Sequence, residues 1–415
     1  MKQLFFLSFL LLAGVTLRAA DYDVRKYGAK GDGVKMNTEA IQKAIDACSK
    51  AGGGRVVLTD GVYLTGPIQL KDGVDLHLER TARLLASPNI EDFPEWKEVK
   101  HVESMNLARS RNACVIFADE AHDIAITGEG TIDGNGTFHV RKRDTPDKNG
   151  WEYERIYEIT KSLPRMVFFT GCSDVRLENV TMVNQPAGWG YWIHDCDRVS
   201  IRGLRIFSEL RYPNNDGIHL NCSRDVTISD CQIETGDDCI VLRANSRSLK
   251  ENKVMERAVI TNCVLRSRAC GIRVGWRNDG VIRNCTASNL VITDSKIGIG
   301  LHLPSPRPNP DYGREATRME HLLFSDIVMD GIYGQPIQAQ IDDSDETHVE
   351  AMQDIRFSNV RSFGRTFPLF KGRKDVPLRR FVFDGCRFVR TDPEAPFVFQ
   401  YAEGFVFNNT TFETL

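Results

Sequence analysis

The chain has 415 residues, 41% of them hydrophobic and 26% charged, with a formal net charge of −3. This length allows one large domain or two ordinary ones. The near balance of charge gives no sign of nucleic acid or a membrane surface as a partner. Beyond the N-terminus no apolar stretch is long enough for a membrane helix, so we expect no membrane anchor.

Residues 1–20 are typical of a secretory signal peptide. Lys2 precedes the apolar stretch Leu4–Leu17, and small residues follow it. The stretch is too short to span a bilayer comfortably, and Arg18 makes the cleavage site imperfect. The sequence therefore predicts an exported protein, either periplasmic or secreted.

After this segment the apolar pattern changes from a helical to a strand period. In Asn37–Lys50 apolar residues recur at helical spacing, and a run of glycines follows. Beyond the glycines come short alternating stretches separated by Gly, Asn, Asp and Pro. They are Arg55–Leu58, Val62–Leu64, Val74–Leu78, Ile124–Ile126, Val175–Leu177 and Val199–Ile201.

A phrase of the form Val-x-Ile/Leu-x-x-Cys/Asn-x-Ile/Val then recurs along the chain. It starts at Val175, Val199, Val226 and Val259, and more weakly at Leu290, Leu322, Ile355, Phe381 and Phe405. Most intervals lie in the twenties and low thirties, as expected of coils with loops of different size. A two-sheet sandwich, the competing all-β interpretation, predicts no such repeat. We therefore predict a parallel β-helix (a solenoid) in a single domain, residues 21–415, whose N-terminal end is capped by the Asn37–Lys50 helix.

Eleven cysteines in an exported protein raise the question of disulfides. Seven of them stand at matching points beside the strand-like stretches: Cys172, Cys196, Cys222, Cys231, Cys263, Cys285 and Cys386. Recurrence at one point of a repeat is typical of stacked buried thiols, since free Cys packs as a small hydrophobe. We expect free thiols rather than bridges. The Cys-x-x-Cys spacing of a zinc site does not occur.

Two charged segments, Asp92–Arg111 and Phe138–Pro164, interrupt the repeat. Long insertions on a solenoid often line one face and form its binding groove. The aromatic residues in them are Trp96, Trp151, Tyr153 and Tyr157. These rings would either stack on sugars or pack the loops onto the solenoid.

Three aspartates lie in glycine-flanked turns. Asp216 belongs to an Asn-Asn-Asp-Gly turn, and Asp237 and Asp238 belong to a Gly-Asp-Asp turn. Hydrolysis of a glycosidic bond needs one carboxylic acid to protonate the leaving oxygen and a second carboxylate across the sugar. The alternative is ordinary turn chemistry, because Asn-Asp-Gly is common in turns. Neighbouring residues of a regular strand point to opposite faces, so the Asp pair shares a cleft only if the chain bends, as Gly236 would permit.

These segments resemble glycoside hydrolase family 28, the polygalacturonase family of right-handed parallel β-helix enzymes. The likeness covers nearly the whole chain after the signal peptide. It begins at Tyr27-Gly-Ala-Lys-Gly-Asp-Gly, an opening shared with other pectin-degrading β-helices, and continues through Asn37–Cys48. The Asn214-Asn-Asp216-Gly and Gly236-Asp-Asp238 turns carry it most specifically.

The resemblance implies an inverting hydrolysis. Asp237 would be the general acid, and Asp216 and Asp238 would position and deprotonate the attacking water. Asn214, in the same turn as Asp216, would bind substrate. Ionising all three clustered carboxyls is energetically unfavourable because like charges repel, so one of them should keep its proton near neutral pH. Inversion also needs room for water, roughly 6.5–9.5 Å between acid and base carboxyls.

Two family segments are altered in this chain. The Gly-His-Gly of the family corresponds to Ala269–Gly271, so Cys270 replaces the active-site His. The Arg-Ile-Lys of the family corresponds to Gly300–His302, so its Arg is absent and His302 replaces its Lys. Because the family residues contact the substrate and its carboxylate, Cys270 and His302 are candidate substrate-binding positions. Their replacement makes a backbone other than homogalacturonan, or an exo mode, an alternative.

Other cations near these segments are candidates for binding a substrate carboxylate. They are Arg243 and Arg273, with Arg277 a weaker candidate, since arginine is a two-pronged donor to carboxylates. His194 belongs to a Trp-x-x-His phrase common in the family and would be either a substrate-binding or a packed structural residue.

We therefore predict an inverting glycoside hydrolase that cleaves α-glycosidic bonds of a uronic-acid-containing pectic polysaccharide, of galacturonan or rhamnogalacturonan type. Two alternatives remain: a β-eliminating polysaccharide lyase and a non-catalytic glycan-binding solenoid. No cofactor or metal is implied, because hydrolysis needs only water and protons. We expect a monomer whose partner is the polysaccharide or an oligosaccharide.

Overall fold

The computed structural model describes residues 20–96, 98–102, 113–147, 155–159, 163, 165–305, 316–343 and 348–415. Residues 1–19, which make up nearly all of the predicted signal peptide, lie outside this set. So do parts of both insertions, including Trp151 and Tyr153. In the part of the chain that the structure describes, no helix is both long and apolar enough to cross a membrane.

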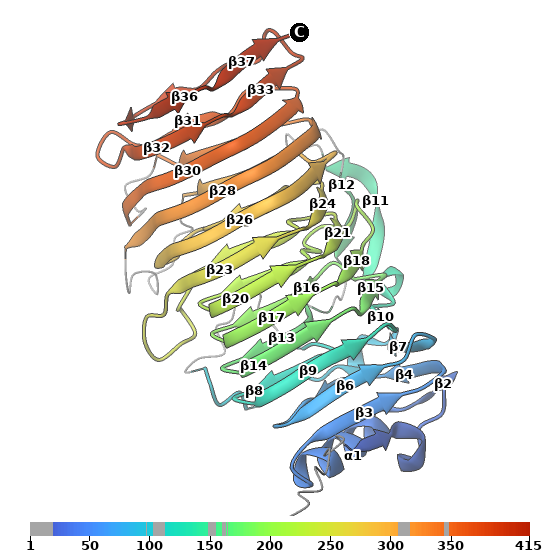
Figure 1. The fold of residues 1–415 in the computed structure, drawn as a ribbon. Coiled ribbons are helices and arrows are strands. Elements are labelled where there is room, and N and C mark those ends of the chain that lie inside the picture. Colours follow the sequence, from blue (N-terminus) through green and yellow to red (C-terminus); the bar gives the residue numbers. More distant parts are fainter. Residues whose placement is uncertain are drawn as a thin grey trace, which may run out of the picture.

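Parallel strands stack coil upon coil along the whole molecule, from the N-terminal coils to the C-terminus (Figure 1). Short turns lead the chain from one sheet into the next within each coil. One described pairing, between β11 (Val140–Asp147) and β12 (Arg155–Ile159), is antiparallel and forms a separate ribbon beside the stack. The predicted parallel β-helix is confirmed.

An 11-stranded parallel sheet contributes one strand to each coil and forms the floor of the site described below. Its strands are β5 (Ile68–Gln69), β8 (Ile116–Asp119), β13 (Arg165–Thr170), β16 (Trp189–His194), β19 (Ile218–Asn221), β22 (Ile240–Arg243), β25 (Cys270–Val274), β27 (Ile297–Leu303), β29 (Ile337–Ile341), β31 (Leu369–Lys371) and β34 (Phe399–Gln400).

A 24-stranded sheet supplies the remaining walls of the coils. Its strands are β1 (Asp21–Asp23), β2 (Asp32–Met36), β3 (Gly54–Leu58), β4 (Gly61–Thr65), β6 (Val74–Leu78), β7 (Ala82–Ala86), β9 (His122–Gly128), β10 (Thr131–Asp133), β14 (Ser173–Glu178), β15 (Thr181–Val183), β17 (Asp197–Arg202), β18 (Arg205–Phe207), β20 (Arg224–Ser229), β21 (Gln232–Thr235), β23 (Met255–Thr261), β24 (Val264–Ser267), β26 (Val281–Thr293), β28 (Thr317–Ile332), β30 (Val349–Gly364), β32 (Leu378–Asp384), β33 (Arg387–Arg390), β35 (Ala402–Glu403), β36 (Val406–Asn408) and β37 (Thr411–Thr414).

The helix α1 (Thr38–Lys50) covers the first coil, where a strand edge would otherwise be open (Figure 1). Its buried face consists of Ala40, Ile41, Ala44, Ile45 and Cys48, the apolar residues at helical spacing. The predicted capping helix is confirmed. Three short 3-10 helices also occur in the described residues: η1 (Val24–Tyr27), η2 (Ile90–Asp92) and η3 (Gly136–His139).

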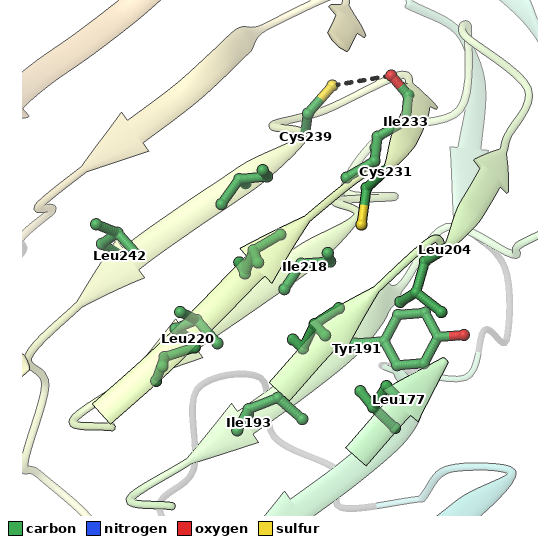
Figure 2. Packing of buried hydrophobic residues seen from close by; sticks show 14 of the residues in the cluster. Leu177, Tyr191, Ile193, Leu204, Ile218, Leu220, Cys231, Ile233, Cys239 and Leu242 are labelled. Atoms are coloured by element: carbon green, nitrogen blue, oxygen red, sulfur yellow. Dashed lines mark hydrogen bonds between the residues drawn. The ribbon is translucent and has the colours of Figure 1, made fainter. Parts of the chain in front are cut away.

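The interior of the solenoid is a continuous stack of aliphatic side chains. Ile193, Leu220 and Leu242 occupy matching positions of β16, β19 and β22, so each packs on its counterpart in the next coil (Figure 2). All eleven cysteines are buried and free, which confirms the prediction of thiols over disulfides. Cys239 points into this interior and its thiol donates to the carbonyl oxygen of Ile233 at 3.5 Å (Figure 2). Because alternate residues of each strand face inward, the other half faces outward, and this outer face carries the site.

Candidate active site

A groove of about 830 Å³ runs over the outer face of the 11-stranded sheet. Eight of the residues singled out from the sequence as catalytic or substrate-binding line it: Asn214, Asp216, Asp237, Asp238, Arg243, Arg273, Arg277 and His302. The other lining residues are Trp189, His219, Val241, Trp276, Lys296, Ile297, Gln335 and Gln338. The structure thus brings the three aspartates of two separate turns to one concave surface.

The Asp-Asp pair lies in a bend between β21 and β22. Gly236 starts this bend, and a methyl group on it would lie 2.6 Å from Asn215 Oδ1 and closer still to the carbonyl oxygen of Tyr212. Only glycine fits there without a shift of the backbone. Two hydroxyls, Thr235 Oγ1 and Ser267 Oγ, donate to the carbonyl oxygen of Asp237 at 2.6 and 2.7 Å. The bend is therefore fixed from both sides, and both carboxyls reach the groove.

The carboxylate of Asp237 is held by two backbone amides. The N–H of Asn214 donates to its Oδ2 at 3.2 Å, and the N–H of Asp238 donates to its Oδ1 at 3.1 Å. Asn214 has a φ of 58°, in the left-handed region that Asn tolerates better than most residues. The turn of Asp216 and the turn of Asp237 are thus tied together directly.

Asp238 is paired with a cation. Its Oδ2 lies 2.6 Å from Arg273 Nε, and its Oδ1 accepts the N–H of Cys270 at 3.0 Å. Burial opposes ionisation of Arg273, but the negative charge of Asp238 outweighs it and raises the pKa of the guanidinium. The guanidinium carbon also lies 4.6 Å from the ring of Trp276.

Asp216 lies beside a histidine that the sequence analysis did not single out. His219 Nδ1 is 3.5 Å from Asp216 Oδ2, and the imidazole packs on the ring of Trp189 with centroids 4.1 Å apart. Burial lowers the pKa of His219 to about 3, so the ring is neutral at ordinary pH. The sequence feature that could have identified His219 is its position three residues after Asp216, on the strand that follows the turn.

The groove also contains two further contacts between a basic side chain and a carboxylate. Arg243 Nε lies 2.7 Å from the fully buried carboxylate of Asp279, which also accepts the N–H of Trp276 at 2.9 Å. His302 Nε2 lies 2.9 Å from Asp342 Oδ1. Burial works against ionisation of Asp342, but the hydrogen bond and charge of His302 prevail and lower its pKa to about 2. Arg243, like Arg273, is therefore bound to a carboxylate of the protein itself.

On the N-terminal side of the aspartates, the outer face of the sheet carries a cluster of packed aromatic residues, which we call the aromatic wall and define as Trp96, Phe117, Phe168 and Trp192. Phe117, Phe168 and Trp192 occupy matching positions of β8, β13 and β16, in the same outward row as His219. Trp96 stacks on Phe117 with centroids 4.5 Å apart, and Phe168 stacks on Trp192 at 4.6 Å. The three residues on the strands are at most 2% exposed. The floor of the sheet is therefore covered on this side of the aspartates and open on the other.

The family model for glycosyl hydrolases family 28 matches residues 55–368 of the chain. The chain belongs to this family. A second model, described as rhamnogalacturonase A/epimerase, pectate lyase-like, matches residues 22–78. The predicted family is confirmed.

The chain is similar to plant and bacterial proteins. A probable polygalacturonase of Vitis vinifera is 28% identical over 298 residues, which cover 69% of this chain and 58% of that protein. An exo-poly-alpha-D-galacturonosidase of Dickeya chrysanthemi is 28% identical over 312 residues, covering 67% of this chain and 51% of that protein. The chain thus spans little more than half the length of these two relatives.

The fold is likewise that of a solved family 28 structure. The family 28 exopolygalacturonase of Yersinia enterocolitica matches with a TM-score of 0.75, at 22% sequence identity, over 95% of this chain and 76% of its own. This likeness confirms the predicted right-handed β-helix architecture.

Two of the residues selected by the resemblance to family 28 lie outside the groove lining. His194 is buried, with Nδ1 3.0 Å from Thr170 Oγ1 and Nε2 3.2 Å from Ser248 Oγ, and burial lowers its pKa to about 3. These are the contacts of a packed structural histidine, the alternative that its sequence phrase left open. Cys270 is fully buried as well, and burial raises the pKa of its thiol. Its contribution to the site is the backbone N–H that it donates to Asp238.

Of the insertion aromatics singled out from the sequence, the structure describes Trp96 and Tyr157, and both pack against other aromatic rings of the protein. Trp96 packs the first insertion onto the solenoid as part of the aromatic wall. Tyr157 packs edge-on against Tyr212, with ring centroids 4.9 Å apart. Among the residues that the structure describes, no three His, Cys, Asp or Glu side chains are grouped as a metal ion would require.

Proposed function

We propose that the protein is an inverting hydrolase of α-glycosidic bonds in a uronic-acid-containing pectic polysaccharide, of galacturonan or rhamnogalacturonan type. The observation that carries this proposal is the presence of three carboxyls, from two tied turns, on one groove of a family 28 chain. Asp237 would protonate the leaving oxygen, and Asp216 and Asp238 would orient the water and remove its proton. Relatives named polygalacturonase and exo-poly-alpha-D-galacturonosidase support a pectic backbone.

The rest of the groove suits an acidic sugar chain. Trp276 offers a ring on which a sugar can stack, and Arg277 and Lys296 add positive charge to the lining. The guanidinium carbon of Arg277 lies 5.2 Å from the Trp276 ring, so stacking surface and charge are adjacent. We propose that these three residues bind the substrate, with Asn214 and His302 from the sequence prediction.

We further propose an exo mode of action. The aromatic wall on β16 stands two strands away from β22, about 10 Å from the bend that carries Asp237. This distance leaves room for a terminal sugar but not for a continuing chain. An internal bond of a long polymer would need an open floor on both sides of the aspartates.

Product analysis tests both proposals. Wild type and Asp237→Asn would be incubated with polygalacturonan and with rhamnogalacturonan in the presence of a chelator, and Asp230→Asn would be the control. Asp230 is an exposed turn residue of the 24-stranded sheet, outside the groove lining. We expect saturated products from wild type and the control, and a loss of about 10²–10⁴-fold in Asp237→Asn.

Other outcomes would support a different function or mode of action. Unsaturated products, or products lost on chelation, would indicate the lyase alternative. Binding of the polysaccharide without turnover would indicate a glycan-binding solenoid. Monomers alone would support the exo mode, and mixed oligomers would contradict it.

We also propose that residues 1–20 direct export and are removed, and that the mature protein is a monomer built as one domain. N-terminal sequencing of protein from the periplasm or the medium tests the first point. Light scattering of the purified protein tests the second, because a monomer would scatter as a particle close to its chain mass.

A further inference from the structure

The buried pair of Arg273 and Asp238 has a consequence for the order of protonation in the site. Arg273 is 8% exposed and Asp238 is 6% exposed, with 2.6 Å between Nε and Oδ2. A charge-assisted bond of this length in a buried setting strongly favours the ionised carboxylate. The second oxygen of Asp238 also accepts a bond, from the N–H of Cys270. Both oxygens are therefore bound to donors.

The sheet fixes the guanidinium in this position. Arg273 pairs in register with Val241 of β22 on one side and with Gly300 of β27 on the other. A methyl group on Gly300 would lie 3.0 Å from the Cys270 thiol and in ordinary contact with Arg273 Nη1 at 3.9 Å, so the backbone of β27 lies close beside the guanidinium. Trp276 lies on the guanidinium at 4.6 Å.

A direct role in binding a substrate carboxylate fits these contacts poorly. Two-pronged recognition of a carboxylate needs two adjacent N–H groups that face the ligand. In Arg273 the Nε is bound to Asp238, and the Nη1 is covered and has no hydrogen-bond partner in the structure. The side chain is thus turned toward the protein's own carboxylate.

Among the described residues, the other titratable and charged groups near the pair are Asp237, Cys270, His219, Arg243 and Asp279, and Arg277, Lys296 and His302 line the same groove. Cys270 and His219 are uncharged at ordinary pH because both are buried. Arg243 and Asp279 neutralise each other. Asp238 is therefore in direct contact with a full positive charge, that of Arg273, whereas two neutral backbone N–H groups donate to Asp237.

We propose that Arg273 is a positioning residue that keeps Asp238 ionised and so leaves the catalytic proton on Asp237. Without the guanidinium the adjacent carboxyls would compete for one proton, and part of the enzyme would hold it on the wrong residue. This inference rests on the proposed hydrolysis. The energetic coupling between Arg273 and Asp238, however, can be tested without any substrate.

The substrate-free test is a double-mutant cycle on thermal stability. Wild type, Arg273→Gln, Asp238→Asn and the double variant would be melted at pH 7, with Arg198→Gln as control. Arg198 forms an exposed pair with Asp174 at 2.7 Å on the 24-stranded sheet. We expect each single variant to lower Tm, the double variant to lower it by clearly less than the sum, and the control to change it little. Additive losses would overturn the proposal. If Arg273→Gln does not fold, Arg273→Lys in the same cycle decides the question.

The second test is the pH profile of kcat on whichever of polygalacturonan or rhamnogalacturonan the wild type cleaves. We expect Arg273→Gln to lower kcat 10- to 100-fold with little change in KM, and to move the profile upward by about one pH unit, because both aspartates lose a neighbouring cation. Arg273→Lys should restore most of the shift. A raised KM with an unchanged profile would show that Arg273 binds substrate instead and would overturn the proposal. Failure of the proposed hydrolysis removes this second test but leaves the stability cycle intact.

Discussion

The backbone N–H of Asn214 donates a 3.2 Å hydrogen bond to the Oδ2 atom of Asp237. This bond joins two turns of neighbouring coils, one carrying Asp216 and the other carrying Asp237 and Asp238. A parallel β-helix repeats its turns at one point of each coil, so residues 20 to 30 apart in sequence meet in this way. The distances among the three aspartates therefore depend on the local backbone of these two turns.

Substitutions of Asn214 distinguish the role of its backbone from the role of its side chain. Asn214→Gly keeps the left-handed conformation and the donated N–H but removes the side chain that lines the groove. We expect it to raise KM and leave kcat nearly unchanged. Asn214→Ala should in addition lower stability by about 1 kcal/mol, because Ala is strained at positive φ. Equal kinetics of the Gly variant and wild type would show that the side chain does not bind substrate.

Gly236→Ala should disturb the bend itself. The new methyl would overlap Asn215 Oδ1 and the carbonyl oxygen of Tyr212, so the bend must move. We expect kcat to fall about 100-fold and stability to fall by about 1–3 kcal/mol. Gly385→Ala, outside the groove lining, is the control: its methyl meets its nearest atom only at 4.0 Å, although its φ of 66° adds a backbone strain that Gly236 does not have. Unchanged kcat in Gly236→Ala would contradict the assignment of the bend.

His219 should not titrate in the working range. Its pKa of about 3 means that it binds no proton between about pH 4 and pH 8. His219→Asn should lower kcat about 10-fold, because it loses the packing on Trp189 and the contact with Asp216. The pH dependence of kcat near pH 6.5 should be the same in the variant and in wild type. The exposed His122 provides the control in His122→Asn. Loss of a limb near neutral pH on replacing His219 would contradict its neutral state.

The aromatic wall predicts product length. Trp96→Ala removes the ring that covers Phe117, while Trp96→Phe keeps an aromatic stack in place. We expect the Ala variant to lose about 1–3 kcal/mol of stability and to release longer products, and the Phe variant to resemble wild type. The size distribution of products over the first few per cent of conversion gives the answer. An unchanged distribution in the Ala variant would mean that the wall does not determine product length and would contradict the proposed exo mode.

The segment that covers the wall is held by a pH-dependent contact. His101 Nε2 lies 2.8 Å from Asp195 Oδ2; burial opposes protonation of the imidazole, but the carboxylate prevails and raises the pKa of His101. Stability from a raised pKa is fully present below the unfolded value of about 6.5 and is lost as pH rises through the folded value.

His101→Gln should therefore cost about 1–2 kcal/mol at pH 5 and progressively less above pH 7. Melting of wild type and variant across pH 5–9 measures this difference. A stability difference between wild type and His101→Gln that stays constant or grows as pH rises would show that the charge on His101 does not stabilise the fold.

The solenoid and the three aspartates could be predicted from the sequence because both are marked by local sequence patterns. A strand phrase repeated at coil spacing predicts stacking, and Asp216, Asp237 and Asp238 stand in short turns with flanking glycines. His219 left a weaker signal, a histidine three residues after Asp216 on the strand that follows the turn, and only its contact with Asp216 shows its place in the site.

Contacts that depend on strand register could not be predicted from sequence. Arg273 meets Asp238 because β25 pairs with β22, although the two residues are 35 apart. Arg243 meets Asp279 at a similar separation of 36 residues. Both arginines were expected to face a substrate carboxylate, and only tertiary structure shows that each has a carboxylate of the protein as its partner. The aromatic wall has the same origin, since Trp96 reaches it from an insertion with no periodic pattern.

The stereochemistry of cleavage tests the proposed roles of Asp216, Asp237 and Asp238 most directly. Proton NMR of wild-type enzyme acting on an α-linked pectic oligosaccharide would record the anomeric signals of the new reducing end during the first minutes, before mutarotation. We predict that the β-anomer appears first, as expected when water attacks opposite the leaving group. The α-anomer appearing first would require a covalent intermediate and contradict the assignment of Asp216 and Asp238 to water.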